Sequence, residues 1–166
     1  MPARLPVPHF NVINGGAHAA NALRFQEFML APTGAPTMAE AVRYGAEVYA
    51  ALRTLVIERF KTAGVGDEGG FAPDLTTPEQ ALDLLVDATD LAGYRPGADV
   101  TFALDPAANG FFLGEQYEPG DGRVDTIDLV RRYERLIGAY PIRSIEDGLA
   151  EIDRPGWRML AGGLAE

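Results

Sequence analysis

The stretch VTFALD, Val100 to Asp105, is an apolar segment that ends in a carboxylate. Its β-branched and aromatic residues favour a short buried strand. A second segment of similar design, IRSIED, runs from Ile142 to Asp147 and follows residues at helical spacing. Because strand side chains alternate between two faces, Asp105 and Glu146 each share a face with the residues two and four positions earlier. Two buried strands separated by a helix predict an α/β fold.

The segments around these strands complete the predicted order of elements. LPVPHFNVINGG, residues 5–16, predicts a strand that runs into a turn at Asn14-Gly15, and RFQEFMLAPTG, residues 24–34, predicts the returning strand. Capping boxes that begin at Thr37 and Thr77 predict the starts of two helices. With a third helix before IRSIED and one more in the tail, the order β-β-α-α-β-α-β predicts a mostly parallel sheet covered by helices.

Composition excludes several classes of function. The 166 residues suit one domain, and the absence of cysteine excludes disulfides, thiolate metal sites and a cysteine nucleophile. The formal charge of −10 argues against a nucleic-acid partner, because phosphate binding requires a basic face. The sequence has no apolar run long enough to span a membrane. We therefore expect a cytoplasmic protein without a nucleic-acid or membrane partner.

Asp105 and Glu146 are candidate metal ligands. In parallel α/β folds the active site lies at the carboxyl ends of the strands, where both acids come. Two converging carboxylates repel each other, and Mg²⁺ prefers hard oxygen ligands of this kind. An acid just after a strand is equally typical of the N-cap of the next helix, and spacing alone leaves both interpretations open. Asp147 is the better candidate for that cap than Glu146.

Further candidate residues lie in the first half of the chain. His18, in NGGAHAAN, is either a solvated loop residue or a catalyst. Gln26 and Glu27 are polar residues within an apolar strand, so we expect them on opposite faces, with one of them facing a buried or bound group. Glu68 lies in AGVGDEGGFAP, residues 63–73, which by itself is typical of a flexible turn with solvated charges.

Taken together, these segments resemble the enolase family. The similar segments occur in the family's order: FNVINGGAHAAN, FQEFMLAPTGAPTMAEAVRYGAEVY, VGDEGGFAPDL, EQALDLL, LAGYRPG, ALD and YPIRSIEDGLAE. The resemblance implies a partial TIM-like barrel, roughly the first four strands of an eight-stranded barrel, with a ββαα opening before the βα units. It identifies residues 1–166 as part of the C-terminal barrel domain, with the N-terminal α+β domain and the second half of the barrel absent.

The resemblance also implies an activity and a role for each candidate residue. Enolase is phosphopyruvate hydratase, a carbon-oxygen lyase of glycolysis that uses Mg²⁺ to convert 2-phosphoglycerate to phosphoenolpyruvate. Asp105 and Glu146 match two of three metal-binding carboxylates. Glu68 matches the general acid, and Glu27 matches a carboxylate that works beside it and contacts substrate. The remaining matches are a substrate-contacting amide, Gln26, and a histidine on a loop near the substrate, His18.

Other features depart from the enolase pattern. The third metal carboxylate and the lysine base have no matching positions in the 166 residues, and Pro106, Gly110 and Ala20 replace residues usual in the family. We therefore expect the isolated chain to be inactive. The alternative hypothesis is a non-catalytic enolase remnant or interaction module. Open sheet edges would favour its association with another copy or with a complementary barrel half.

Overall fold

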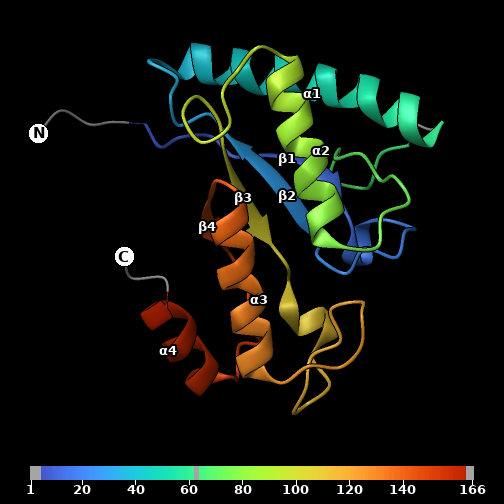
Figure 1. The fold of residues 1–166 in the computed structure, drawn as a ribbon, viewed down its shortest axis with the longest axis vertical. Helices are drawn as coiled ribbons and strands as arrows, with labels where there is room; N and C mark the ends of the chain where they lie inside the picture. The colour runs from blue at the N-terminus through green and yellow to red at the C-terminus, as the bar shows by residue number, and fades with distance from the viewer. Residues whose placement is uncertain (1–4, 62–63, 164–166) are drawn as a thin grey trace, which may run out of the picture.

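A computed structural model describes residues 5–61 and 64–163 of the chain (Figure 1). Its strands are β1 (Phe10–Asn14), β2 (Glu27–Ala31), β3 (Thr101–Asp105) and β4 (Ile142–Ile145). Its α-helices are α1 (Met38–Phe60), α2 (Pro78–Leu91), α3 (Thr126–Ala139) and α4 (Arg154–Gly163), and its 3₁₀ helices are η1 (Gly16–His18) and η2 (Ala108–Phe111). The predicted order of strands and helices is confirmed. Within the described ranges, no helix is both long and apolar enough to cross a membrane.

The four strands form an open sheet in the order β1-β2-β3-β4. The pairs β1/β2 and β2/β3 are antiparallel, and only β3/β4 is parallel among the described strands. The expectation of a mostly parallel sheet is therefore wrong. Two successive helices, α1 and α2, connect β2 to β3. The second helix adds one reversal of the chain, so β3 runs antiparallel to β2. One helix, α3, separates β3 from β4, which gives the parallel pair.

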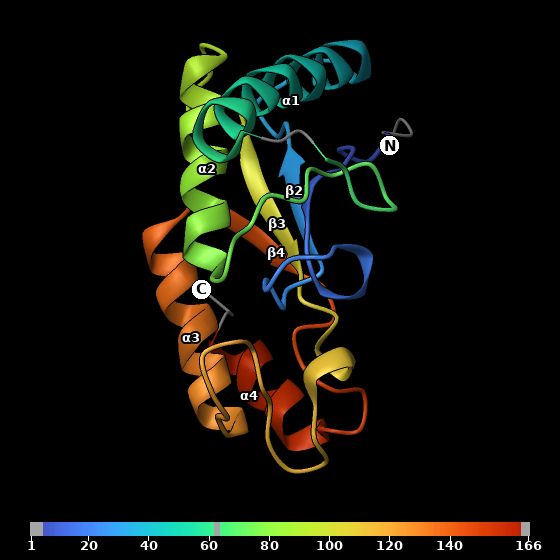
Figure 2. The same cartoon turned by 90° about the vertical axis from the view of Figure 1, so that its right-hand side faces the viewer.

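One face of the sheet packs on the helices. Figure 2 shows α2 and α3 along this face, with α1 crossing α2 at one end. The side chains that the sheet contributes to this core are fully buried: Phe28, Leu30, Phe102 and Leu104. The side chains of Glu27 and Asp105 lie on the other face of β2 and β3. The helices do not cover that face, so both acids are available for a site there.

β4 differs from the prediction of a second buried strand. Arg143 and Ser144 are exposed, and only Ile142 is buried in this strand. β4 is an outer strand of the sheet, so within the described residues it has a neighbour on one side only. Its polar centre suits such an exposed edge better than a central position.

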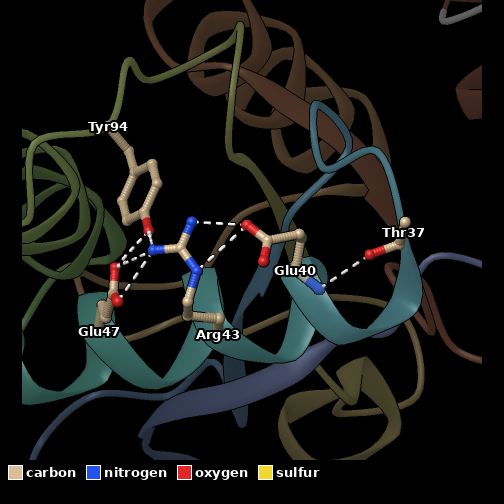
Figure 3. Close-up of polar contacts among 5 residues, drawn as sticks. All are labelled: Thr37, Glu40, Arg43, Glu47 and Tyr94. Atoms are coloured by element: carbon tan, nitrogen blue, oxygen red, sulfur yellow. Dashed lines mark hydrogen bonds and ion pairs between the residues drawn. The ribbon is translucent and has the colours of Figure 1, made fainter.

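The helix caps explain where α1 and α2 begin. The Thr77 hydroxyl accepts a hydrogen bond from the Gln80 backbone at 3.4 Å, and the Gln80 side chain accepts one from Thr77 N at 3.2 Å, which completes the predicted box. The Thr37 hydroxyl accepts from Glu40 N at 3.2 Å. The second half of that predicted box is missing, because the Glu40 carboxylate instead accepts from Arg43 at 2.6 Å (Figure 3).

The same arginine connects α1 to the segment after α2. Arg43 donates to both carboxylate oxygens of Glu47 at 3.0 Å, and the Tyr94 hydroxyl also donates to Glu47 (Figure 3). The Tyr94 ring lies 4.2 Å from the Tyr44 ring, centroid to centroid. Tyr94 follows Gly93, whose φ of +84° suits the end of α2. This cluster therefore holds the start of the α2–β3 connection against the outer side of α1.

Candidate active site

The polar candidates come together at one edge of the sheet. Asn14 at the end of β1 pairs with Glu27 at the start of β2, and Glu27 pairs with Asp105 at the end of β3. Glu146 follows β4, and its backbone N–H donates to Leu104 O at 2.9 Å. Antiparallel and parallel pairings thus bring the ends of three strands and the start of a fourth to the same edge. Four residues that are distant in sequence lie there side by side.

The connection from β1 to β2 is longer than the predicted turn. Asn14 is the last residue of β1 and is fully buried, and the chain passes through η1 before it returns at Glu27. Hydrogen bonds from Gly15 N to Gln26 O at 2.9 Å and from Gly16 N to Leu23 O at 2.7 Å hold the connection closed. The prediction of a two-residue turn at Asn14-Gly15 is therefore wrong. The buried Asn14 side chain is available to hydrogen-bond other parts of the site.

The acidic loop, here residues 64–73, is docked on β1 and is not a loose turn. Phe71 N donates to Val12 O at 2.8 Å, and Asn14 N donates to Phe71 O at 2.9 Å. The Asn14 side-chain oxygen accepts from Gly70 N at 2.9 Å. A Cβ added at Gly70 would lie 2.6 Å from that oxygen, so only glycine permits this approach. Two glycines of GDEGG, Gly66 and Gly70, therefore allow close packing against Asn14.

This docking directs the Glu68 carboxylate toward polar groups of the β1–β2 region. Asn11 and Asn14 donate their side-chain amides to one Glu68 oxygen at 3.0 Å and 3.2 Å. The other oxygen lies 3.5 Å from Nε2 of His18. The Glu68 side chain retains one third of its exposure, so it is oriented by the protein while it remains accessible to a ligand. Sequence reasoning missed both asparagines, although both precede the glycine turn in the quoted segment.

Glu27 has an unusual carboxyl group. Its pKa is raised to about 7, mainly by burial and further by a hydrogen bond with the Glu68 side chain and by repulsion from Glu68 and Asp105. A hydrogen bond from the Gln26 side chain partly opposes it. Gln26 and Glu27 were expected on opposite faces, but their side chains meet. Gln26 precedes the first residue of β2, so the alternation of strand side chains does not apply to it.

Asp105 also experiences a surplus of negative charge. Burial raises its pKa, and the carboxylates of Glu146, Asp147 and Glu68 raise it further against a hydrogen bond from Ala107 N at 2.8 Å. The donor set has the hard-oxygen chemistry that suits Mg²⁺. In the residues that the structure describes, however, no three His, Cys, Asp or Glu side chains are grouped closely enough to hold a metal ion. The described residues thus present carboxylates of the kind that suits Mg²⁺ without a group of three.

A pocket of about 550 Å³ lies beside these acids. Its lining includes the polar residues Arg24, Gln26, Asp105, Asn109 and Asp147. Arg24 and Asp147 were not predicted as site residues, because neither stands out in the sequence. His18, Glu27, Glu68 and Glu146 are not part of this lining, so the candidate residues form two adjoining groups, one around Glu68 and one around Asp105.

The prediction of Asp147 as a helix N-cap is wrong. Asp147 has a φ of +41°, and its backbone oxygen accepts from Ala108 N at 2.9 Å. The residue that caps α4 is Asp153, whose carboxylate accepts from Gly156 N at 3.0 Å. A turn between β4 and α4 separates the strand from the helix, and Asp147 lines the pocket instead.

Comparison with known proteins identifies the family. Residues 2–166 match the family described as "Enolase, C-terminal TIM barrel domain". The chain belongs to this enolase family. An enolase of Rubrobacter xylanophilus is 54% identical over 162 residues, which cover 96% of this chain and 38% of that relative's length. The chain thus spans well under half the length of the curated relative that it matches.

Family membership explains the architecture described above. The open sheet of four strands, with mixed pairing at its start, is consistent with part of an enolase TIM barrel. The predicted resemblance to enolase, and with it the assignment to a lyase family and to a partial barrel, is confirmed. The roles of individual residues are a separate question, and they rest on the geometry of the site.

Proposed function

We propose that this chain contributes the proton-donating side of an enolase active site, which uses Mg²⁺ to dehydrate 2-phosphoglycerate to phosphoenolpyruvate in glycolysis. In that reaction a base removes the proton next to the substrate carboxylate, and the C–O bond of the neighbouring carbon breaks. The leaving hydroxide takes a proton from a general acid and departs as water. Glu68 is the proposed acid, with Glu27 beside it and His18 on its other side.

The observation that carries this proposal is the hydrogen-bonded pair of Glu27 and Glu68. Burial and the neighbouring Glu68 side chain raise the pKa of Glu27 to about 7, so Glu27 retains a proton close to neutral pH, next to the proposed acid. A proton kept at this pH is what a general acid requires. Gln26, which hydrogen-bonds to Glu27 and lines the pocket, is the proposed substrate-contacting amide.

Asp105 and Glu146 are the proposed metal ligands of the chain. When bound, Mg²⁺ would supply positive charge that offsets the charge developing on the substrate carboxylate. Asp105 and Glu146 repel each other across adjacent strand ends, and this repulsion supports a site for a cation. Because the described residues hold no group of three ligands, we expect weak Mg²⁺ binding by this chain alone.

The residues around Glu68 and Asp105 do not include a lysine that could act as the base. Lys61 is the only lysine in the sequence, and its ammonium group donates to Glu58 O at 2.7 Å at the end of α1. We therefore propose that residues 1–166, the first part of the barrel domain, do not turn over substrate alone. We also propose a cytoplasmic location and a small-molecule substrate, without nucleic-acid or membrane partners. The charge of −10 supports the exclusion of nucleic acid.

The test is the absorbance of phosphoenolpyruvate formed from 2-phosphoglycerate with excess Mg²⁺. We expect no turnover from the 166-residue chain, and restored turnover when the remaining parts of the Rubrobacter xylanophilus enolase are added. In the restored mixture, Glu68→Gln should lower kcat by about 10²-fold or more, the scale of general acid catalysis.

Glu115→Gln makes the same chemical change on an exposed loop and provides the control. Full activity of the Glu68→Gln mixture would remove Glu68 from the mechanism. Turnover by the chain alone at about 10 s⁻¹, an ordinary enzymatic rate, would overturn its proposed inactivity.

A second candidate function is a non-catalytic interaction module. The observation that favours it is the open sheet, in which β4 is an outer strand with an exposed centre. Such an edge would pair with a complementary barrel half or with a second copy. Sedimentation analysis distinguishes the two candidates when combined with the assay, because this alternative expects association without restored turnover.

A further inference from the structure

We propose that Arg24 binds the anionic group of the ligand in the pocket beside Asp105, and that Glu118 occupies Arg24 until the ligand replaces it. The ligand class is a small phosphate- or carboxylate-bearing molecule. This inference deepens the proposed function and rests on it for the identity of the substrate. It names a residue for which the sequence analysis has no role.

The charges that line the pocket show why an anionic ligand needs Arg24. Asp105 and Asp147 both line the cavity, and among its described lining residues Arg24 is the only cation. Glu27 and Glu146 lie at the same sheet edge and add further negative charge. Without a cation, this field would repel a phosphate or carboxylate. Arg24 is the group in the lining that can form charge-assisted hydrogen bonds to such an anion.

The backbone places Arg24 on the pocket side of the chain. Phe25 is fully buried in the core, and its ring stacks against Phe111 at 6.0 Å between centroids. Its neighbours Arg24 and Gln26 both line the pocket. The buried aromatic ring therefore fixes the backbone between them, and the arginine is presented beside the proposed substrate-contacting amide.

The ion pair between Arg24 and Glu118 is weak enough for a ligand anion to replace Glu118. Nη2 of Arg24 lies 3.7 Å from Oε2 of Glu118, and the two side chains are 50% and 40% exposed. An ion pair this long and this exposed contributes little stability, so a ligand anion can compete with it. The second Glu118 oxygen lies 3.8 Å from Nε of Arg123. Glu118 therefore has another cation available when Arg24 turns to the ligand.

The loop that carries Glu118 is also in contact with the stem of Arg24. A Cβ added at Gly120 would lie 3.5 Å from Cγ of Arg24, so the backbone of this loop packs along the side chain. Arg132 holds the same loop to α3 through Asp121, at 2.8 Å between Nη1 and Oδ1. The loop is thus anchored next to the arginine, and only the Glu118 side chain needs to move for an anion to enter.

The experiment measures binding of inorganic phosphate to the 166-residue chain by ³¹P NMR titration without Mg²⁺. We expect Arg24→Gln to weaken binding about tenfold, the scale of one charge-assisted contact. Glu118→Gln removes the competing anion and should strengthen binding several-fold. The matched controls are Arg131→Gln on α3 and Glu115→Gln on the same loop, and both should bind phosphate as the parent chain does.

Unchanged binding by Arg24→Gln would overturn the inference, and so would unchanged or weaker binding by Glu118→Gln. Circular dichroism establishes whether each variant is folded. If Arg24→Gln does not fold, the Glu118→Gln variant still tests whether Glu118 competes with the anion for Arg24. A parallel titration with 2-phosphoglycerate distinguishes a phosphate site from a substrate site, which should bind the substrate more tightly. Phosphate binding through Arg24 without any restored turnover would contradict the proposed function but leave this inference intact.

Discussion

Glu27 and Asp105 are directly paired across the antiparallel strands β2 and β3, so their carboxyl groups lie on the same face of the sheet. The helices pack on the other face, where the neighbouring residues Phe28 and Leu104 are fully buried. This pairing places two acids next to each other. Burial is the largest cause of the raised pKa of each acid. Repulsion from Asp105 adds to the rise at Glu27, and repulsion from Glu146, Asp147 and Glu68 adds to the rise at Asp105, so the site is sensitive to pH.

Stability should fall as the pH rises from about 5 to about 8. The pKa of Glu27 is raised from its ordinary value of 4.5 to about 7, so the folded chain holds this proton more tightly than the unfolded chain. The resulting stabilisation is fully present below about 4.5 and is lost as the pH passes through about 7. The raised pKa of Asp105 acts in the same direction. Urea unfolding at several pH values measures the effect.

Glu27→Gln should flatten that pH dependence, because the amide does not titrate. The same substitution at Glu115, which lies on an exposed loop, should leave the dependence unchanged. If the parent chain becomes more stable between pH 5 and pH 8, the raised pKa of Glu27 is contradicted.

Glu68→Gln should lower the pKa of Glu27. The substitution removes the negative charge beside Glu27 and replaces a competing acid with an amide that can donate a hydrogen bond. NMR titration of the ¹³C-labelled Glu27 carboxyl reports this pKa directly. A Glu27 pKa that stays near 7 in the variant would show that burial alone, without Glu68, sets its value.

Asn14→Ala should release the acidic loop from β1. The substitution leaves the buried Gly70 N–H without its acceptor and removes one donor to Glu68. A buried unsatisfied donor costs about 1–3 kcal/mol, and urea unfolding measures the loss. Asn11→Ala should cost less, because its contact with Glu68 is exposed and its own side-chain oxygen has no partner. Equal effects of the two substitutions would contradict the anchoring role of Asn14.

Gly70→Ala and Gly138→Ala should change stability in opposite directions. At Gly70 the new methyl group would lie 2.6 Å from Oδ1 of Asn14, so the loop must shift and the chain is destabilised. At Gly138, in α3, no atom lies within 4 Å of the new Cβ, and alanine favours the helix by about 0.5–1 kcal/mol. Thermal unfolding of both variants checks the signs, and a stabilised Gly70→Ala would contradict the close packing.

Tyr94→Phe should weaken the attachment of the α2–β3 connection to α1. The phenyl ring can retain its packing against Tyr44, while the hydroxyl that donates to Glu47 and accepts from Arg43 is lost (Figure 3). The expected loss of stability is about 0.5–1.5 kcal/mol, the net value of a typical hydrogen bond. Urea unfolding measures it. No loss in Tyr94→Phe would assign the attachment to ring packing alone.

Much of the fold followed from local patterns in the sequence. The caps at Thr37 and Thr77 marked two helix starts, because capping depends on residues within one turn. The burial of β3 followed from its composition. The exposed centre of β4 and the exposed Val42 of α1 were not predicted, since burial depends on which elements lie opposite.

The candidate site was predicted in part. Asp105 and Glu146 were placed at neighbouring strand ends from their positions after apolar segments, and the β3/β4 pairing agrees with this. The contacts of Glu68 with Asn11 and Asn14 join residues more than fifty positions apart, and no local rule predicts them. Arg24 and Asp147 were missed for the same reason, because only the folded chain brings them to one cavity.

The sequence alone determined the order of the elements, the starts of α1 and α2 and the kinship with enolases, because all three depend on residues close together along the chain. The tertiary structure decided the sheet's mixed pairing, the docking of the acidic loop on Asn14 and the proximity of Glu27 to Glu68. These depend on register between distant segments, and register is settled by packing of the whole core. The proton retained by Glu27 is a consequence of that packing, since burial and repulsion arise only once the strands and the loop are assembled.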